Sequence, residues 1–225
     1  MSHSYTENHL VEQPAIQLFA ELGWHTVSAM EEVLGSPSPQ PSPLKGEGVN
    51  LGRETKSEVV LLSRLRSALE KLNPTLPQEA ISAAIDEISR DRSAMSQAAA
   101  SREVWELLKD GIKVSVPDRQ RNGQKIERVQ VLDWDGPKEN DFLLVSQMTI
   151  TGPLYTCRPD LIGFVNGLPL VVIELKKPSV PAKQAFDENL TSYKHLQNGI
   201  PALFWYNAFM IASNGTDSRV GSLTA

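Results

Sequence analysis

Cysteine is almost absent from this sequence, which has one such residue in 225, Cys157. A single cysteine excludes an intrachain disulfide and a zinc site built from several cysteines. Because no histidine lies near it in the sequence, we interpret Cys157 as a packed structural thiol rather than as a nucleophile. Sparse cysteine is also typical of a reducing compartment, and we therefore expect a cytoplasmic protein.

An excess of positive charge is also missing. The chain has 22 Lys and Arg against 27 Asp and Glu, and its net charge is −5. A free-standing protein that binds DNA by charge alone is usually basic, so that class is excluded. From residue 151 onward the balance is close to neutral, with six basic residues against five acidic ones: Arg158, Lys176, Lys177, Lys183, Lys194 and Arg219 against Asp160, Glu174, Asp187, Glu188 and Asp217. We expect any DNA to be delivered by other domains or subunits.

Long apolar runs are absent too. No stretch approaches the length of a membrane span, and residues 1–13 lack the basic-then-apolar order of a signal peptide. We therefore expect no membrane partner.

The N-terminal part predicts one helix, one strand and one irregular stretch. Apolar residues at helical spacing predict a helix over residues 8–22, and a short strand follows over 24–27. Residues 36–52 are rich in proline and glycine and predict an exposed or disordered loop, inserted at a tolerant position. Glu12 on the first helix has two readings: a solvated acid in the first turn, or a further carboxylate near a metal ion.

Residues 55–110 predict an added helical segment. Apolar side chains recur at helical spacing over residues 55–72 and 77–89, and a third helix is expected over 102–109. Prolines and Asp110-Gly111 separate or end these helices.

Beyond residue 112 the apolar period changes to two, which predicts strands. Strands are expected over residues 112–116, 126–134 and 142–150, a helix over 183–196, and two short strands over 202–208 and 209–213. Gln147 interrupts an apolar face, so it either has a local partner or lines a site. Strands, a helix and further strands fit an α/β fold with a sheet flanked by helices, and residues 170–175 are apolar enough for the sheet centre.

The most informative stretch is RPDLIGFVNGLPLVVIELK, residues 158–176. Asn166-Gly167 tolerates positive φ and predicts a hairpin turn, which folds Asp160 back towards Glu174. Glu174 and Lys176 lie two residues apart on one strand and therefore share a face. Two carboxylates among apolar strands need a compensating cation or substrate, and such oxygen donors suit Mg²⁺.

Asp160, Glu174 and Lys176 resemble the active site of the PD-(D/E)xK nuclease superfamily. The flanking segments GPLYTCRPDLIGFVNGLPLVVIELKKP, AFDENLTSYK and EQPAIQLFAELGW are similar to the amino-terminal nuclease domain of the restriction subunit (HsdR) of type I restriction–modification enzymes. The resemblance covers most of the chain and leaves out residues 36–52.

The resemblance implies a mixed central β-sheet flanked by helices, of the restriction-endonuclease-like kind, with the added helical segment. It implies that residues 1–225 are an endonuclease domain whose catalytic sheet and helix lie within 112–213. Motor domains are expected beyond residue 225. The chain has no Gly-x-x-x-x-Gly-Lys-Ser/Thr motif, so ATP is expected to act only through those domains.

The resemblance also implies roles for individual residues. Asp160, Glu174 and Lys176 match the catalytic positions, with Mg²⁺ (or Mn²⁺ in its place) held by Asp160 and Glu174 and with Glu12 as a further candidate ligand. Tyr193 matches the family's Gln-x-x-x-Tyr motif, whereas Asn189 stands where the family has glutamine. Both are expected to orient the phosphate. The implied activity is sequence-nonspecific DNA cleavage, with the modification and specificity subunits as partners.

Two other functions remain open at this point. One is a nuclease of another PD-(D/E)xK system that works in repair or with a helicase. The other is a non-catalytic docking module of the restriction complex, in which Asp160, Glu174 and Lys176 form a structural ion-pair cluster.

Overall fold

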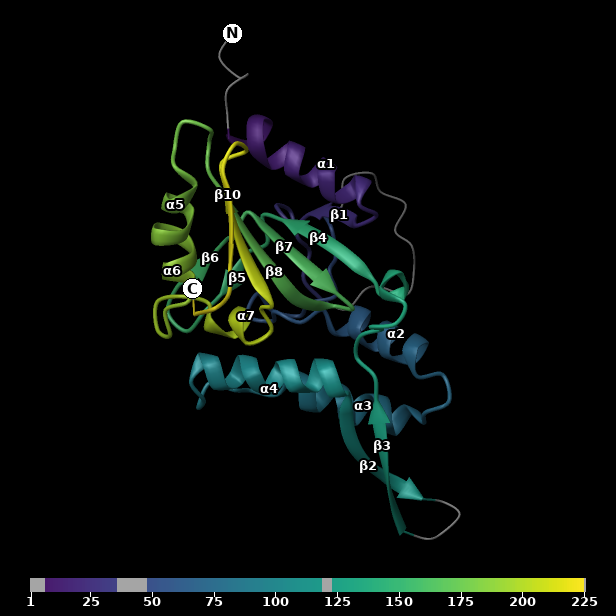
Figure 1. Cartoon of the computed structure of the whole chain (residues 1–225). Helices are drawn as coiled ribbons and strands as arrows, with labels where there is room; N and C mark the ends of the chain where they lie inside the picture. The colour runs from purple at the N-terminus through teal and green to yellow at the C-terminus, as the bar shows by residue number, and fades with distance from the viewer. Residues whose placement is uncertain (1–6, 36–47, 119–122, 225) are drawn as a thin grey trace.

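A six-stranded mixed sheet forms the centre of the protein (Figure 1), for which the computed structural model describes residues 7–35, 48–118 and 123–224. The sheet order is β1-β4-β7-β8-β9-β10. β1 runs parallel to β4, β8 runs parallel to β9, and the other neighbours are antiparallel. The strands are β1 (His25–Ser28), β4 (Phe142–Ser146), β7 (Leu161–Val165), β8 (Leu168–Leu175), β9 (Phe209–Ser213) and β10 (Ser218–Gly221). The predicted α/β class with a mixed sheet flanked by helices is confirmed.

Strand β8 lies inside the sheet, and all of its residues are buried. Its continuous apolar run explains this position, because a strand covered on both faces needs apolar side chains in both directions. The predicted hairpin joins β7 to β8. Asn166 and Gly167 have φ angles of 51° and 80°, as a two-residue turn of this kind requires.

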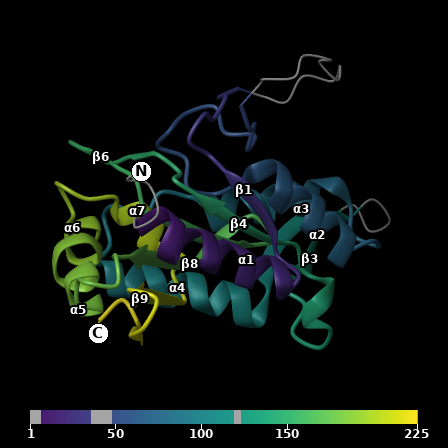
Figure 2. The same ribbon diagram turned by 90° about the horizontal axis from the view of Figure 1, so that it is seen from above.

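Helices cover both sides of the sheet (Figures 1 and 2). On the β1 side a π turn, η1 (Asn8–Glu12), leads into α1 (Gln13–Glu21). On the β9 side the expected regular helix over 183–196 is instead three short pieces: α5 (Ala182–Gln184), the π turn η3 (Ala185–Leu190) and α6 (Thr191–Tyr193).

Three helices lie beside the sheet within the predicted helical segment: α2 (Leu62–Leu72), α3 (Gln78–Ser89) and α4 (Gln97–Asp110). The prediction placed the start of α2 seven residues too early. The reason is tertiary, because the Leu61 N–H donates to Gly167 O at 2.9 Å and ties the preceding chain to the β7–β8 hairpin.

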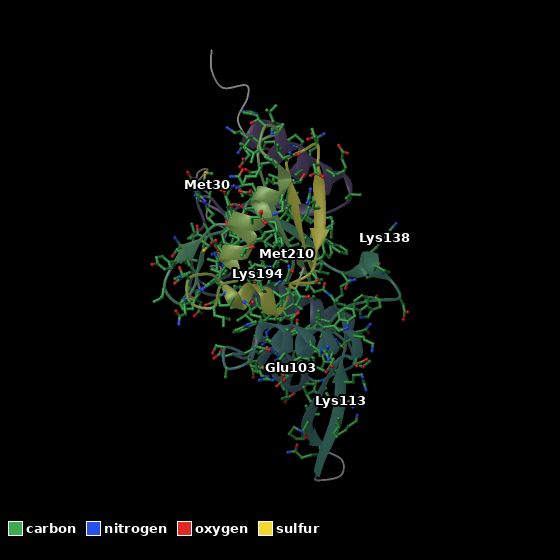
Figure 3. The ribbon with its side chains drawn as sticks, turned by 60° about the vertical axis from the view of Figure 1, so that its left-hand side comes forward. Met30, Glu103, Lys113, Lys138, Lys194 and Met210 are labelled. Carbon is green, nitrogen blue, oxygen red and sulfur yellow. The ribbon has the colours of Figure 1, made fainter. Side chains whose placement is uncertain are left out.

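Strands β2 (Ile112–Asp118) and β3 (Gly123–Val129) form a separate ribbon that extends away from the body of the protein. Figure 3 places Lys113 on this ribbon and Glu103 on α4.

The strand expected over 142–150 is shorter in the structure than predicted. It ends at Ser146, and Ile150–Thr151 (β5) pairs instead with Thr156–Cys157 (β6). A short 3-10 turn, η2 (Pro137–Glu139), precedes β4.

The strand expected over 202–208 was wrong. Pro201–Trp205 is a short helix, α7, with proline in its first turn and Leu203, Phe204 and Trp205 buried. A short buried apolar run has no period that separates strand from helix, whereas proline is favourable in the first turn of a helix.

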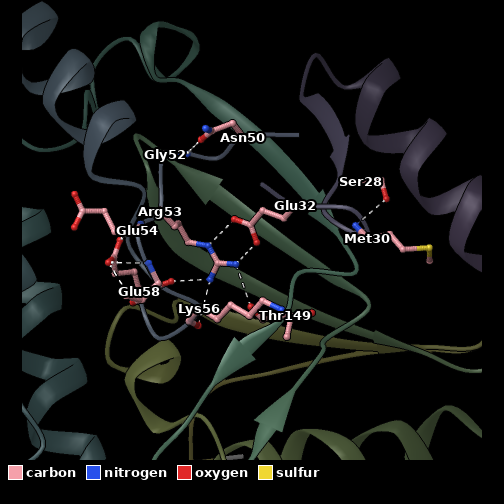
Figure 4. A network of polar contacts seen from close by, with 11 residues as sticks. Ser28, Met30, Glu32, Asn50, Gly52, Arg53, Glu54, Lys56, Glu58 and Thr149 are labelled. Carbon is pink, nitrogen blue, oxygen red and sulfur yellow. Dashed lines mark hydrogen bonds and ion pairs between the residues drawn. The ribbon is translucent and has the colours of Figure 1, made fainter. Parts of the chain in front are cut away.

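Arg53 is fully buried and joins three segments of the chain (Figure 4). Its guanidinium pairs with Glu32 through Nε (2.8 Å) and Nη2, and donates to Glu58 O (2.9 Å) and Thr149 O (3.0 Å). These bonds tie the segment after β1 and the segment before α2 to the chain between β4 and β5.

Part of the predicted loop over residues 36–52 lies outside the described residues, since 36–47 are not described. Residues 48–52 contain no helix or strand, and Leu51 is buried. The partly buried Cys157 packs against the core. Among the described residues, no helix has both the length and the apolar character needed to cross a membrane.

Candidate active site

Asp160 and Glu174 lie opposite each other at one end of the β7–β8 hairpin. The ladder pairs Leu161 with Ile173, and the next step of an antiparallel register brings residue 160 to residue 174. The Leu175 N–H donates to Asp160 Oδ2 at 2.7 Å, which fixes that carboxylate against β8. The predicted convergence of the two acids therefore rests on the turn at Asn166-Gly167.

Glu174 is almost completely buried, with 2% of its surface exposed. Its Oε1 atom accepts hydrogen bonds from Asn189 Nδ2 and, at 3.4 Å, from the Tyr193 hydroxyl. Its Oε2 atom is buried and has no hydrogen-bond partner among the described residues. A buried carboxylate oxygen without a partner is costly, so this atom marks a place where another species is needed.

Lys176 follows β8 directly, and its ammonium lies 3.9 Å from Glu174 Oε1. It donates to Asn189 Oδ1 at 2.9 Å. The Asn189 carboxamide thus lies between the ammonium and the carboxylate and forms one hydrogen bond with each. Tyr193 is one helical turn further on, and its hydroxyl lies 3.4 Å from Asn189 Nδ2. The structure brings together all five residues Asp160, Glu174, Lys176, Asn189 and Tyr193.

Two π turns flank this cluster. Glu12 is the last residue of η1, and Asn189 lies in η3. Single π turns within helices occur frequently at functional sites, because they re-aim side chains by part of a turn. The irregularity of the helix expected over 183–196 is the π turn η3.

Burial dominates the electrostatics of the cluster. It raises the pKa of Glu174 to about 8, with the nearby Asp160 carboxylate as the second cause. It also raises the pKa of Asp160 to about 6, and Glu12 and Glu7 add to that increase. The pKa of Tyr193 is raised by burial and by Glu174. At neutral pH the Glu174 carboxyl therefore favours its protonated form unless a cation is bound, whereas Asp160 is protonated mainly below about pH 6.

The donor set fits a hard divalent cation. Glu174 Oε2 has no hydrogen-bond partner among the described residues. The Leu175 N–H donates to Asp160 Oδ2 and leaves the other oxygen of that carboxylate aside. Within residues 7–35, 48–118 and 123–224 no group of three or more His, Cys, Asp or Glu is arranged to hold a metal ion. Two carboxylates are too few for a structural zinc site, but they suit Mg²⁺, which keeps several water ligands.

Glu12 is buried, with 7% of its surface exposed, so its reading as a solvated acid is wrong. Burial raises its pKa. Its two carboxylate oxygens accept hydrogen bonds from Gln147 Nε2 at 3.1 and 3.2 Å. Gln147 therefore has a distant partner rather than a local one.

Sequence reasoning missed a contact of the N-terminal segment with the end of β8. Glu7 Oε2 accepts a hydrogen bond from the Lys177 N–H at 2.8 Å. Nothing in the local sequence around Glu7 points to this contact, because the two residues are 170 positions apart. Arg158 and Lys177, which lie close in sequence to Asp160 and Lys176, are both exposed.

Known proteins resemble the chain over nearly its whole length. A family model described as "Type I restriction enzyme R protein N terminus" matches residues 4–225. The type I restriction enzyme HindI endonuclease subunit of Haemophilus influenzae is 36% identical over 220 residues, which is 96% of this chain and 19% of that protein. The type I restriction enzyme EcoprrI endonuclease subunit of Escherichia coli is 36% identical over 95 residues, which is 42% of this chain and 30% of that protein. The chain thus spans about a fifth of the length of the Haemophilus relative.

Proposed function

The chain belongs to the family of type I restriction enzyme R protein N termini, and on this premise we propose that it is the DNA endonuclease domain of an R subunit. The observation that carries the proposal is the buried, unpartnered Oε2 of Glu174 opposite Asp160, with Lys176 on the same face of the strand. The relatives named as endonuclease subunits support the same activity.

Asp160 and Glu174 would hold one Mg²⁺, and Mn²⁺ would serve in its place. When bound, the cation lowers the pKa of a coordinated water and polarises the phosphate. Both carboxylates must be ionised for this, and their raised pKa values make that state depend on the cation.

Lys176 places a positive charge beside the carboxylates. Hydrolysis forms a bond between a water oxygen and phosphorus and breaks one phosphorus–oxygen ester bond, so negative charge develops on the phosphate oxygens. The Lys176 ammonium offsets that charge or orients the attacking water. Its bond to Asn189 Oδ1 fixes the position of the ammonium.

Asn189 and Tyr193 orient the groups around the scissile phosphate. Their side chains already hold Glu174 Oε1, so they keep that carboxylate in one position while Oε2 stays available. The exposed residues Lys177 and Arg158, close in sequence to Lys176 and Asp160, would supply positive charge for the DNA backbone.

The protein would cut DNA without reading its sequence. Asp160 and Glu174 would act on the scissile phosphate through the cation, and Lys176 would act on it directly, so none of the three would read a base edge, and phosphate contacts carry no sequence information. The modification and specificity subunits would then choose the target. ATP-driven motor domains beyond residue 225 would deliver the DNA. We also propose that the mixed sheet and its helices have the fold of the PD-(D/E)xK nucleases, on the spacing of Asp160, Glu174 and Lys176.

The test is nicking of circular DNA by the whole restriction complex whose R subunit carries Glu174→Ala or Lys176→Ala. Both variants should lose nicking while ATP hydrolysis continues. The matched controls are Glu139→Ala and Lys71→Ala, which break an exposed 3.0 Å ion pair away from the site. Normal nicking by Glu174→Ala would refute the assignment and favour the docking role.

A further inference from the structure

Gln147 has an unusual backbone conformation for its residue type. It and Asn166 are the two non-glycine residues with positive φ in the described part of the chain, at 57° and 51°. Asn166 is explained by the tight turn between β7 and β8. Glutamine has no comparable local reason, because its side chain is too long to bond its own backbone as asparagine does. Such conformations persist only where the surroundings enforce them, and they gather at functional sites.

The backbone of Gln147 is attached to a residue of the active site. β4 pairs with β7 up to Ser146 and Leu161, and the Gln147 N–H then donates to Asp160 O at 2.9 Å. The left-handed residue is therefore fixed to the main chain of the residue whose carboxylate faces Glu174.

The side chain of Gln147 reaches in the other direction, to Glu12. Nε2 lies 3.1 and 3.2 Å from the two oxygens of that carboxylate. Among the described residues no Lys or Arg forms an ion pair with Glu12, although 93% of its surface is buried. Gln147 is thus the group that sets where this carboxylate points.

The space beside these two side chains is open. A cavity of about 200 Å³ is lined by Glu12 and Gln147, together with the polar side chains of Asn8, Ser28 and Ser146. It has room for ordered water. Glu12 acts on Asp160 electrostatically, yet it forms no three-carboxylate group with Asp160 and Glu174. Its place is therefore beside the cation-binding pair rather than within it.

We propose that Gln147 is a positioning residue of the nuclease site, which links the main chain of Asp160 to the Glu12 carboxylate and holds Glu12 as a hydrogen-bond acceptor for the waters of the bound divalent cation. This inference rests on the proposed function. It assigns Glu12 a role through water, which suits a cation that keeps much of its hydration shell. Groups that act on a metal through its first ligands typically change its affinity by about 10- to 100-fold.

The experiment measures Mn²⁺ binding by calorimetry to the nucleotide-free R subunit, with the heat of the Glu174→Ala variant subtracted as background. Gln147→Gly removes the carboxamide and at the same time suits the positive φ, so the protein should melt at or above the wild-type temperature. Its Mn²⁺ affinity should fall by about tenfold or more. Glu12→Gln should show the same loss, and the double variant should lose no more than either single variant.

Gln13→Ala is the matched control, since Gln13 is exposed and lines the same cavity without a hydrogen bond to Glu12. It should bind Mn²⁺ normally. In the whole complex, raising the Mn²⁺ concentration should restore nicking by Gln147→Gly but not by Glu174→Ala. Gln147→Glu, which keeps the length and places a second carboxylate against Glu12, should also weaken Mn²⁺ binding.

Three results would overturn the inference: normal Mn²⁺ affinity in Gln147→Gly, losses that multiply in the double variant, or a lower melting temperature that accounts for the weaker binding. Failure of the proposed function looks different. In that case Glu174→Ala itself would bind Mn²⁺ as the wild type does.

Discussion

The Asn189 carboxamide donates a hydrogen bond to one oxygen of Glu174 and leaves the other oxygen without a partner. Its own oxygen accepts a bond from Lys176 at 2.9 Å. Asparagine has one methylene fewer than glutamine, yet here it spans the ammonium and the carboxylate. Asn189 lies in the π turn η3, and single π turns of this kind are frequent at functional sites.

Replacing Asn189 by alanine should therefore lower DNA nicking by about tenfold or more, because Lys176 and Glu174 both lose the group that positions them. The Asn189→Gln variant should keep most of the activity, since it retains the carboxamide. Nicking of circular DNA by the restriction complex, at equal protein concentration and with melting curves recorded, checks both variants. Equal activity in Asn189→Ala and wild type would show that the bridge has no part in cleavage.

The sequence already contained the centre of this cluster. Asp160 and Glu174 meet because strand alternation and the Asn166-Gly167 turn are local properties, and such properties are readable from residue order. Asn189 and Tyr193 are four residues apart, so their common helix face is also local. The roles of these residues in catalysis stay predictions.

Long-range partners are what residue order did not reveal. Glu12 is buried, and its hydrogen-bond partner Gln147 lies 135 positions away, so a local pattern could only leave its exposure open. Arg53 bonds Thr149 across 96 positions, and no periodicity marks either residue. The short helix α7 was mistaken for a strand because its apolar residues are buried whatever their secondary structure.

Glu174 and Asp160 should make the stability of the metal-free protein depend on pH. Their contribution to the free energy of unfolding should fall as pH rises. Burial raises the pKa of Glu174 from 4.5 to about 8 and that of Asp160 from 3.8 to about 6. The folded chain therefore holds protons that the unfolded chain has released, and linkage makes the folded state less stable with increasing pH. The contribution is complete below the ordinary pKa values and is lost as pH rises through the raised ones.

Denaturant unfolding of the 225-residue chain in a chelator, between about pH 5 and about pH 8.5, measures this effect. The Glu174→Gln variant should show a flatter dependence, because it has no proton to lose at that position. Adding Mg²⁺ should stabilise the wild type most at the high end of the range, since the cation binds the ionised pair. Identical slopes for wild type and Glu174→Gln would contradict the prediction.

Replacing Arg53 by methionine should lower the free energy of unfolding by about 3–5 kcal/mol, as expected for a buried charge that loses its partner. Glu32 would be left buried without a cation, and the carbonyl oxygens of Glu58 and Thr149 would each lose a donor. The control is Arg219→Ala, which breaks an exposed 3.5 Å pair with Asp217 and should cost no more than about 0.5 kcal/mol. Denaturant unfolding of both variants gives the comparison, and equal costs would show that the Arg53 network contributes little.

Gly167 should tolerate no side chain, and the reason is both its own conformation and its neighbours. Its φ is 80°, and an added Cβ would lie 2.6 Å from Leu61 O and 2.7 Å from Leu65 N, which are backbone atoms at the start of α2. Gly23 is the matched control: its φ is 90°, but an added Cβ would meet nothing within 4 Å.

Gly23→Ala should cost about 1–2 kcal/mol, which is the strain of the left-handed conformation alone. Gly167→Ala should cost about 1–3 kcal/mol more, because α2 must shift away from the hairpin. Since that hairpin sets Asp160 against Glu174, Gly167→Ala should also weaken Mn²⁺ binding by the R subunit, whereas Gly23→Ala should not. A Gly167→Ala protein as stable as Gly23→Ala would show that α2 yields without cost.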